Sequence, residues 1–203
     1  MTSIFIYLFA LARAPLQGRL LDVGCGEGLL HDMLKGRSRG ADAVEVIGVD
    51  IYLPYLRRAK NRGREVVQAH AAHLPFRDKT FDGVISLEVI EHLSKEEGYQ
   101  MLEELERICR GRIIVSTPKK FEEQGAGSPN PFELHRSAWT PKEFRKRGYK
   151  VRYLPKKIGL LIPFYIVYRF GILAQHIFAI KEMDSSLTKP YNTRTEQAST
   201  QAS

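Results

Sequence analysis

The sequence is poor in cysteine, and neither glycine nor proline is abundant. Its two cysteines, Cys25 and Cys109, exclude a disulfide framework or a zinc site built from four cysteines, and they favour a reducing compartment. With 16 glycines, 10 prolines and 43% hydrophobic residues, the composition excludes collagen-like or wholly disordered chains. Because a domain averages about 150 residues, the 203 residues predict one domain with a modest extension.

The sequence also lacks an uninterrupted apolar run of the length that a membrane-spanning helix needs, which is about 20 residues. Residues 4–12 are apolar but follow no positive residue, so we expect a helix that packs on the core rather than a signal peptide. Residues 158–180 form a second apolar block, which is interrupted by Pro163 and Arg169. For this block a core, lid or membrane-associated role stays open, and a spanning helix is the less favoured interpretation.

The C-terminal residues contain few side chains that could be buried. Residues 184–203 therefore cannot offset the entropic cost of ordering themselves, and we expect a disordered tail after a single domain at 1–183. Since no signal peptide is expected, we predict a cytoplasmic protein, and peripheral contact with a membrane stays open.

Positive charge is concentrated in one segment of the chain. The formal net charge is +8, yet residues 1–100 contain 13 acidic and 13 basic residues and contribute nothing to it. Residues 136–157 contain nine basic residues and only one acidic residue, which accounts for the whole excess. Such a segment attracts an acidic partner, for example a phosphate, a carboxylate or an anionic membrane surface. The alternative is a solvated helix face without a partner.

Short segments rich in β-branched residues alternate with segments of helical periodicity. This alternation predicts parallel β-α-β units with right-handed crossovers, and therefore an α/β fold with a doubly wound sheet. One helix is marked by Thr140 as a good N-cap, Pro141 at the first helical position and Gly148 as a stop. The expected strands are 19–23, 44–49, 65–68, 81–87, 112–116, 150–154 and 176–181, and the expected helices are 4–12, 29–34, 55–60, 96–109 and 141–147.

A glycine-rich loop follows the first expected strand in the segment LLDVGCGEGLL. In an open parallel sheet, ligands bind at the carboxyl ends of the strands, and Gly24, Gly26 and Gly28 would let a ligand approach the backbone closely. A dinucleotide fingerprint would need glycine at the position of Leu29, and a pyrophosphate would be repelled by the acidic Asp22. The loop therefore favours a cationic sulfonium ligand over a nicotinamide dinucleotide.

Asp50 ends the second expected strand in VIGVDI, where an acidic side chain accepts hydrogen bonds from both hydroxyls of a ribose. With these motifs the sequence resembles the class I S-adenosylmethionine-dependent methyltransferases, and in particular their type 11 group. The resemblance covers about residues 19–149, through DVGCGEG, VIGVDI, the LPF of AHLPF, FDGVISLEVIEHL and GRIIVSTP in the family's order and spacing. It implies a Rossmann-like, doubly wound and mostly parallel seven-stranded sheet with an antiparallel last strand.

The resemblance implies that the glycine loop holds the methionine portion of S-adenosylmethionine. The backbone of Gly24, Cys25 and Gly26 would contact this portion, and Gly28 would complete the loop. Asp22 would act on the amino group, either directly or through water. Because Cys25 sits within the loop without a partner histidine in its motif, we expect no nucleophilic role for its thiol.

The remaining implied contacts involve the nucleoside and the transferring methyl group. Asp50 would bind the ribose, and Ile51 would lie against the adenine. Where the family usually has an aspartate and an alanine for the adenine amino group, this chain has His70 and Ala71, which leaves the backbone of Ala71 for that contact. The residues that would flank the methionine and the methyl group are Leu87 and Glu88.

Methyl transfer from a sulfonium is an in-line displacement, so the enzyme aligns the reactants, excludes water and takes up a proton from an oxygen or nitrogen acceptor. We expect no metal. The candidate bases are Glu91, His92 and His135, because each could reach the end of the sheet beside the methyl group. For His92, a purely structural role is the alternative. His135 belongs with Asn130 and Trp139 to NPFELHRSAW, which resembles a substrate-side loop of microbial relatives.

We predict a methyltransferase for a small-molecule or lipid-like acceptor, with residues 136–180 forming a basic helix and an apolar lid on the acceptor side. Peripheral contact with an anionic membrane surface stays open. The alternatives are a nucleic-acid methyltransferase that uses the basic segment, a binding subunit without turnover and a dehydrogenase. SLEVIEHL replaces the Asn/Asp-Pro-Pro-aromatic motif of amino-methylating nucleic-acid enzymes, the complete cofactor motifs disfavour a binding subunit, and Leu29 disfavours a dehydrogenase.

Overall fold

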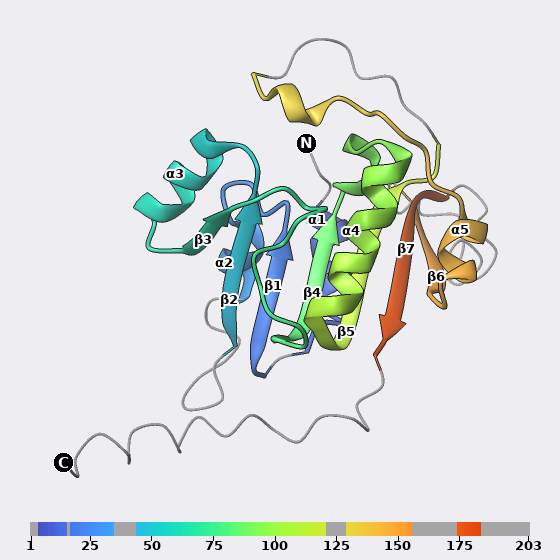
Figure 1. Ribbon diagram of the computed structural model, residues 1–203, viewed down its shortest axis with the longest axis horizontal. Coiled ribbons are helices and arrows are strands. Elements are labelled where there is room, and N and C mark those ends of the chain that lie inside the picture. The colour runs from blue at the N-terminus through green and yellow to red at the C-terminus, as the bar shows by residue number, and fades with distance from the viewer. Residues whose placement is uncertain (1–3, 16, 35–43, 121–128, 156–173, 184–203) are drawn as a thin grey trace.

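The computed structural model describes residues 4–15, 17–34, 44–120, 129–155 and 174–183. Within these residues it contains a sheet with helices on both faces (Figure 1). The helices are α1 (Ile4–Leu11), α2 (Leu29–Leu34), α3 (Leu53–Asn61), α4 (Lys95–Ile108) and α5 (Pro141–Lys146), with two 3-10 helices, η1 (Ile90–His92) and η2 (Pro131–Glu133). The strands are β1 (Arg19–Val23), β2 (Glu45–Asp50), β3 (Glu65–Gln68), β4 (Phe81–Leu87), β5 (Cys109–Pro118), β6 (Lys150–Pro155) and β7 (Ala174–Glu182).

The described strands form a 7-stranded sheet in the order β3-β2-β1-β4-β5-β7-β6. Strands β1 to β5 pair in parallel, whereas β7 runs antiparallel to both of its neighbours, β5 and β6. The strand order reverses between β1 and β4, and at such a switch point the carboxyl ends of the strands border a ligand-binding crevice. The predicted doubly wound, mostly parallel sheet with an antiparallel last strand is confirmed.

Strand residues alternate between two cores, one on each face of the sheet. Leu21 packs with α4 on one face, and its neighbour Leu20 packs with α1 and α2 on the other (Figure 1). Successive side chains of a strand point to opposite faces, so the continuous apolar run of β1 supplies both cores. The expected packing of the first helix on the core is confirmed, since the ring centroids of Phe9 and Phe178 lie 4.3 Å apart.

Helices α4 and α5 begin with capping boxes, in which a hydroxyl and a carboxylate bind the free backbone N–H groups of the first turn. Ser94 and Glu97 form the first box, and Thr140 and Glu143 form the second, which confirms Thr140 as the N-cap. The ammonium of Lys95 lies 2.6 Å from the carboxylate of Glu143. This ion pair joins the beginnings of the two helices beside the carboxyl end of β4.

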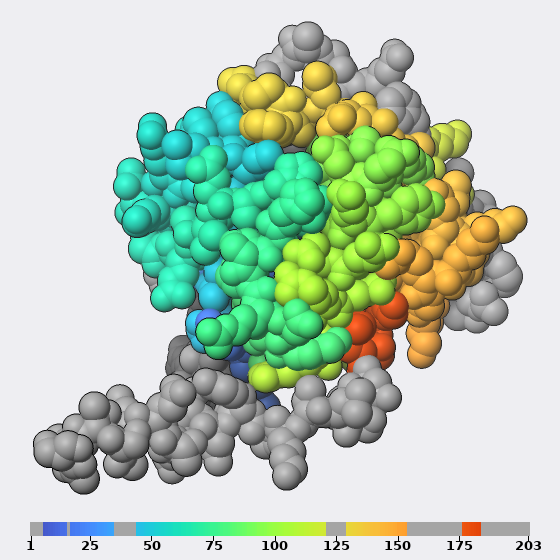
Figure 2. Space-filling view, viewed as in Figure 1, coloured from blue at the N-terminus to red at the C-terminus, as the bar shows by residue number. Residues whose placement is uncertain are grey.

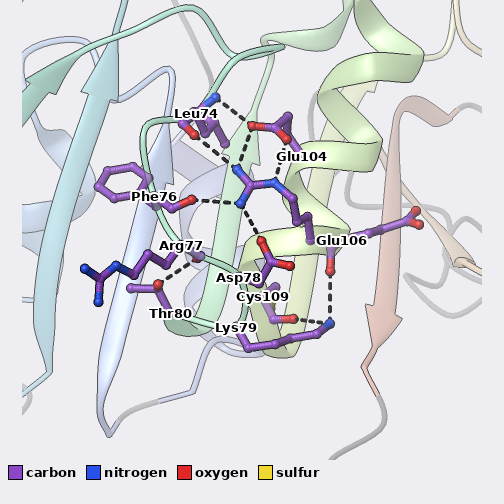
Figure 3. Close-up of polar contacts among 10 residues, drawn as sticks. Leu74, Phe76, Arg77, Asp78, Lys79, Thr80, Glu104, Glu106 and Cys109 are labelled. Atoms are coloured by element: carbon purple, nitrogen blue, oxygen red, sulfur yellow. Dashed lines mark hydrogen bonds and ion pairs between the residues drawn. The ribbon is translucent and has the colours of Figure 1, made fainter.

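An arginine of α4 holds the connection between β3 and β4 in place (Figure 3). The guanidinium of Arg107 donates hydrogen bonds to the backbone oxygens of Leu74, at 3.1 Å, and Phe76, at 2.8 Å. The same group forms ion pairs of 2.7 Å with Asp78 and with Glu104. Three of these four contacts attach the connection to α4, and the connection also carries the alanine expected beside the adenine.

The apolar block at 158–180 belongs to the core in its C-terminal part, so an apolar lid that extends to residue 180 is wrong, whereas the strand expected at 176–181 is confirmed. Residues 174–180 belong to β7, in which Ile177, Phe178 and Ala179 have no exposed surface. A strand that is paired on both edges and covered on both faces needs apolar residues along its whole length, which explains this part of the block. Residues 158–173 and the expected tail at 184–203 lie outside the described residues. In the part that the structure describes, no helix has the length and apolar character to cross a membrane.

Candidate active site

The glycine loop after β1 is held against the end of β2. The N–H groups of Gly24 and Cys25 both donate to the carbonyl oxygen of Val49, at 2.7 and 2.9 Å. These two bonds keep the carboxyl ends of β1 and β2 side by side. The Cys25 thiol points into the sheet, because a Cβ added at Gly48 would lie 2.7 Å from its sulfur. Burial raises the pKa of this thiol, so the backbone of Cys25 is its only part suited to contact a ligand.

The three glycines of the loop have positive φ angles but different surroundings. A Cβ added at Gly24 would collide with the side chain of Val89, and one added at Gly28 would collide with Arg64. At Gly26 the only heavy atom within 4 Å would be a ring carbon of Tyr55, at 3.9 Å. Gly24 and Gly28 are therefore required by the packing of the protein itself, whereas Gly26 borders open space that a ligand could fill.

Asp50 connects the glycine loop to the beginning of α3. One oxygen of its carboxylate accepts a hydrogen bond from the N–H of Gly26, and the other accepts one from Tyr52, both at 2.8 Å. Each carboxylate oxygen has a second acceptor position, so the group retains the capacity to bind two hydroxyls. Burial raises the pKa of Asp50 although the two N–H donors favour its charged form.

Acidic groups gather where β1 and β4 end. Asp22 is 4% exposed, and burial, together with the charge of Asp50, raises its pKa to about 7. Glu88 follows β4 with a φ of 57°. Its carboxylate accepts a hydrogen bond of 2.6 Å from the Ser116 hydroxyl and lies 3.3 Å from His176 Nε2. A region this rich in carboxylates favours a cationic ligand.

Tyr7 of α1 belongs to this acidic region, although the sequence marked α1 only as a core helix. Burial raises the pKa of its hydroxyl, and the negative charges of Asp22 and Glu88 raise it further. The tyrosine hydroxyl is the single polar side-chain group in the helix IFIYLFAL. That isolated hydroxyl was the signal from which a functional position could have been suspected.

The residues expected around the adenine lie beside Asp50. The N–H of Ala69, in the connection after β3, donates to the backbone oxygen of Asp50 at 3.2 Å. The side chain of Gln68 donates to the backbone oxygen of Ile51 at 3.0 Å. The side chain of His70 bonds to the backbone two residues further along the chain, because its Nδ1 accepts a hydrogen bond from the N–H of Ala72 at 3.2 Å. Ile51 and Ala71 are partly exposed here, and Leu87 is buried at the end of β4.

The three candidate bases come together after β4. One potential ligand atom from each of Glu91, His92 and His135 lies within 4.8 Å of the others. The ring centroids of His92 and His135 are 5.0 Å apart. Burial raises the pKa of Glu91 well above its usual value, with a further contribution from Glu88, and burial lowers the pKa of His92. Burial therefore favours a neutral imidazole at His92 near pH 7.

Residues 129–140 bridge the carboxyl end of the sheet (Figure 1) and lie against α3 and α4 in the space-filling view (Figure 2). On the α3 side, the Tyr55 hydroxyl donates to the Glu133 carboxylate at 2.7 Å. On the η1 side, the N–H groups of Arg136 and Ser137 donate to the backbone oxygen of Glu91, at 2.7 and 3.0 Å. We call residues 129–140 the bridging segment. It brings His135 to η1.

Trp139 does not face a substrate, contrary to its expected place in a substrate-side loop. It is 1% exposed, and its indole N–H donates to the backbone oxygen of Ile90 at 3.2 Å. Apolar side chains of the bridging segment do face solvent, since Phe132 is 47% and Leu134 50% exposed. The bridging segment thus combines a buried anchor with an apolar outer surface.

The predicted basic segment is partly neutralised. Arg136 lies 3.0 Å from Glu97, and Arg147 lies 3.3 Å from Glu106. Lys156 and Lys157 lie outside the described residues. The exposed cationic side chains on and beside α5, which we call the basic cluster, are Lys142, Arg145, Lys146 and Lys150.

Residues 21–114 match the sequence model of a family described as a methyltransferase domain. The uncharacterised protein MJ0638 of Methanocaldococcus jannaschii is 29% identical over 177 residues, which cover 86% of this chain and 73% of that protein. The probable tRNA methyltransferase 9B of Mus musculus is 40% identical over 112 residues, or 51% of this chain and 24% of that protein. The demethylmenaquinone methyltransferase of Thermus thermophilus is 40% identical over 114 residues, or 52% and 49%. The chain therefore spans less than half the length of the two relatives with named activities.

Solved structures with a similar fold include two that are described as methyltransferases. A putative methyltransferase in complex with the Haloferax volcanii Trm112 methyltransferase activator has a TM-score of 0.63 at 17% identity, covering 87% of this chain and 86% of that chain. The methyltransferase domain of a bacterial Hen1 has a TM-score of 0.57 at 26% identity, covering 89% and 96%.

Proposed function

We propose that this chain, a class I S-adenosylmethionine-dependent methyltransferase of the type 11 group, methylates a small-molecule or lipid-like acceptor at the carboxyl end of the sheet. S-adenosylmethionine supplies an activated methyl group on a sulfonium. The apolar surface of the bridging segment supports this class of acceptor. The chain's own side chains would bind and orient the two reactants and exclude water between them.

The acidic region fits the cofactor's charges. Asp22 and Glu88 lie where an ammonium group and a sulfonium would gain from nearby carboxylates. Asp50 retains acceptor positions for two ribose hydroxyls, and Gly26 borders the open space that the methionine portion needs. Tyr7 would close the region from the α1 side. These contacts are the proposed cofactor site, with Gly24, Cys25 and Gly28 shaping its loop.

The cluster of Glu91, His92 and His135 would handle the acceptor's proton. Glu91 and His92 lie in η1, shortly after Glu88, and His135 of the bridging segment lies beside them, so an acceptor at this cluster can meet the methyl group in line. Imidazoles that are neutral near pH 7 favour loss of a proton from an oxygen or nitrogen nucleophile. The bridging segment would exclude water from the same space, since it covers η1 with buried hydrogen bonds.

The observation that carries the acceptor class is the pair of exposed apolar side chains on the bridging segment. Phe132 and Leu134 flank Glu133 and lie within three residues of His135, and each leaves about half of its surface in solvent. Burial of such side chains against an acyl, prenyl or aromatic group stabilises binding by about 25 cal/mol per Å². An amphiphilic acceptor would place its apolar part here and its polar group at the cluster.

A second candidate is a nucleic-acid acceptor, which the basic cluster favours. Lys142, Arg145, Lys146 and Lys150 are exposed together and could contact phosphates. They lie on and beside α5, which packs on β6 and β7 at the sheet edge away from β1. A nucleic acid would therefore have to extend from that edge to the site. We favour the amphiphilic acceptor because its contacts lie next to the candidate bases.

The test is methyl transfer from labelled S-adenosylmethionine into separated lipid, small-molecule, RNA and protein fractions of a cell extract. We expect label in the lipid or small-molecule fraction. The double variant Phe132→Ser/Leu134→Ser should lower this transfer at least fivefold while cofactor affinity stays unchanged, because both side chains are exposed. Leu8→Ser, on the exposed surface of α1, is the matched control. Label confined to RNA would instead favour the second candidate.

A further inference from the structure

The cluster behind the bridging segment has the composition of a transition-metal site. Glu91 offers a carboxylate, and His92 and His135 each offer an imidazole nitrogen, with the three ligand atoms within 4.8 Å of one another. We propose that these three side chains bind one divalent cation, and that the cation binds a hydroxyl oxygen of the acceptor. The second part rests on the proposed function. In-line transfer from a sulfonium does not itself require a metal, so this proposal departs from the sequence-based expectation.

Glu91 gives an independent reason to place a cation here. Its side chain is 2% exposed, and neither carboxylate oxygen forms a hydrogen bond of good geometry within the described structure, although the Thr117 hydroxyl is near enough to lower the pKa of Glu91. A buried carboxylate without a partner is unfavourable, and buried charges are normally paired or bound to a metal. Nδ1 of His92 is buried without a partner as well. A cation between these groups would satisfy both.

The distances allow coordination after small side-chain rotations. A cation with ligand bonds of about 2.0–2.2 Å draws its ligand atoms to within about 4.4 Å of each other, even when they lie on opposite sides. The present upper limit of 4.8 Å is close to this value. Rotation about the side-chain bonds of Glu91 and His135 can supply the difference without moving the backbone.

The backbone that carries the three ligands is already fixed. Arg136 and Ser137 donate their N–H groups to the oxygen of Glu91, and the Ser137 hydroxyl donates to the oxygen of Ile90 at 3.3 Å. These bonds attach the His135 side of the site to the η1 side. The ligands thus come from two segments far apart in the sequence that are held together before a cation binds. Such preorganisation lowers the entropic cost of binding.

The ligand set indicates the kind of cation. Two imidazoles with one carboxylate suit Zn²⁺, Mn²⁺, Fe²⁺ or Co²⁺, whereas Mg²⁺ and Ca²⁺ prefer oxygen ligands. Three protein ligands leave coordination positions open, as in catalytic rather than structural sites. Glu88, three residues before Glu91, adds negative charge nearby.

An open position beside the methyl group gives the cation a task in the reaction. With Glu91, His92 and His135 bound to the cation, the cation rather than a free imidazole promotes loss of the acceptor's proton, because a bound hydroxyl has a lowered pKa and loses its proton to water more readily. The oxygen then forms a bond to the methyl carbon while the carbon–sulfur bond breaks, and the sulfonium becomes a neutral thioether. This step uses no oxidant or reductant. It assigns the acceptor to molecules that carry an alcohol, phenol or other hydroxyl group.

The test is titration of chelator-treated protein with Mn²⁺ or Zn²⁺, followed by calorimetry and, for Mn²⁺, by electron paramagnetic resonance. We expect one cation per chain and at least tenfold weaker binding of Mg²⁺. Glu91→Gln and His135→Ala should each weaken Mn²⁺ binding at least tenfold. His73→Ala, which removes an exposed histidine of the β3–β4 connection, should leave it unchanged. Binding that is absent from the wild type, or equal in all variants, would overturn the proposal.

Two further measurements separate this proposal from the proposed function. Affinity for S-adenosylmethionine is measured on the same samples, and thermal unfolding shows whether each variant is folded. If the cofactor binds and no cation does, the metal site is wrong and the proposed cofactor site stands. If the cofactor does not bind, the proposed site fails. Transfer to the acceptor fraction should fall at least tenfold in chelator and recover with Mn²⁺, and transfer that is insensitive to chelator would contradict the role of the cation.

Discussion

At the scale of single residues, the site holds carboxylates that are unfavourable in the free protein. Asp22 is almost completely buried, and both its burial and the charge of Asp50 oppose its ionisation. Glu91 is buried, and neither of its carboxylate oxygens forms a hydrogen bond of good geometry within the described residues. Groups of this kind persist in proteins when a ligand compensates them, which is why strongly perturbed carboxylates in a crevice indicate function. The same residues therefore lower the stability of the free protein and raise its affinity for cations.

Asp22→Asn tests this balance through pH. The folded protein holds the pKa of Asp22 at about 7, compared with 3.8 when the group is unperturbed. Well below pH 3.8 the group is protonated in both the folded and the unfolded state, so it does not change the free energy of unfolding. As the pH rises to 7, the unfolded state ionises first, so wild-type stability falls by up to about 4 kcal/mol. The variant should therefore be more stable than the wild type at pH 8, and its advantage should shrink towards pH 5.

Urea denaturation of both proteins at pH 5, 7 and 8 measures this difference. On addition of S-adenosylmethionine at pH 8, the wild type should gain more stability than the variant, because only its carboxylate can interact with the ligand's positive charges. A variant advantage that does not change with pH would show that Asp22 has an ordinary pKa.

Asp50→Ala removes the acceptor expected for the ribose hydroxyls. Two hydroxyls would then lie in the site without their partner, so we expect a loss of about 1.5–3 kcal/mol in affinity for S-adenosylmethionine and for its demethylated product. Isothermal titration calorimetry measures both. Because Asp50 also holds the N–H groups of Gly26 and Tyr52, the variant's unfolding curve is recorded in parallel. A folded variant with unchanged affinity would place the ribose elsewhere.

At the scale of elements, the glycine loop contains positions that the packing of the protein requires and one position, Gly26, that borders the space for a ligand. Gly26 has a φ of 54° and Gly63 one of 73°, and neither faces a close neighbour that an added methyl group would strike. An alanine at either position costs about 1–2 kcal/mol in stability for its backbone conformation. Gly26→Ala should in addition lower cofactor affinity at least tenfold, whereas Gly63→Ala should not. Equal affinities of the two variants would remove Gly26 from the site.

The elements themselves follow from local patterns, and for that reason the sequence predicts them well. The Thr140–Pro141 cap, the periodicity of α4 and the place of Asp50 at the end of β2 each depend on neighbours within a few residues. What the sequence did not predict depends on contacts between distant elements. Trp139 is a buried anchor because its N–H meets an oxygen 49 residues away, at Ile90. The place of the Tyr7 hydroxyl likewise depends on how α1 packs behind the sheet.

At the scale of the whole molecule, positive and negative charges occupy different regions. Asp22, Asp50 and Glu88 gather at the ends of β1, β2 and β4, while the basic cluster lies at the sheet edge formed by β6 and β7. Ion pairs of Arg136 and Arg147 with α4 remove two charges from the predicted basic segment. The basic cluster remains exposed. Because its positive charges lie close together, it could attract an anionic surface towards the side of the molecule that carries the bridging segment.

The triple variant Lys142→Gln/Arg145→Gln/Lys146→Gln tests whether the basic cluster binds an anionic partner. Each cationic side chain near an anionic membrane contributes about 1 kcal/mol, so we expect partitioning onto phosphatidylglycerol-containing vesicles to fall at least tenfold at low salt. The difference should disappear near 1 M salt, where the Debye length is about 3 Å.

Arg57→Gln/Lys60→Gln/Arg77→Gln removes the same charge from exposed positions elsewhere and is the matched control. Since no substituted residue lies in the proposed cofactor site, affinity for S-adenosylmethionine should be unchanged in both. Equal partitioning of the two triple variants would mean that the basic cluster is a solvated surface without an anionic partner. Binding of a lipid-like acceptor would then depend on the apolar side chains of the bridging segment alone.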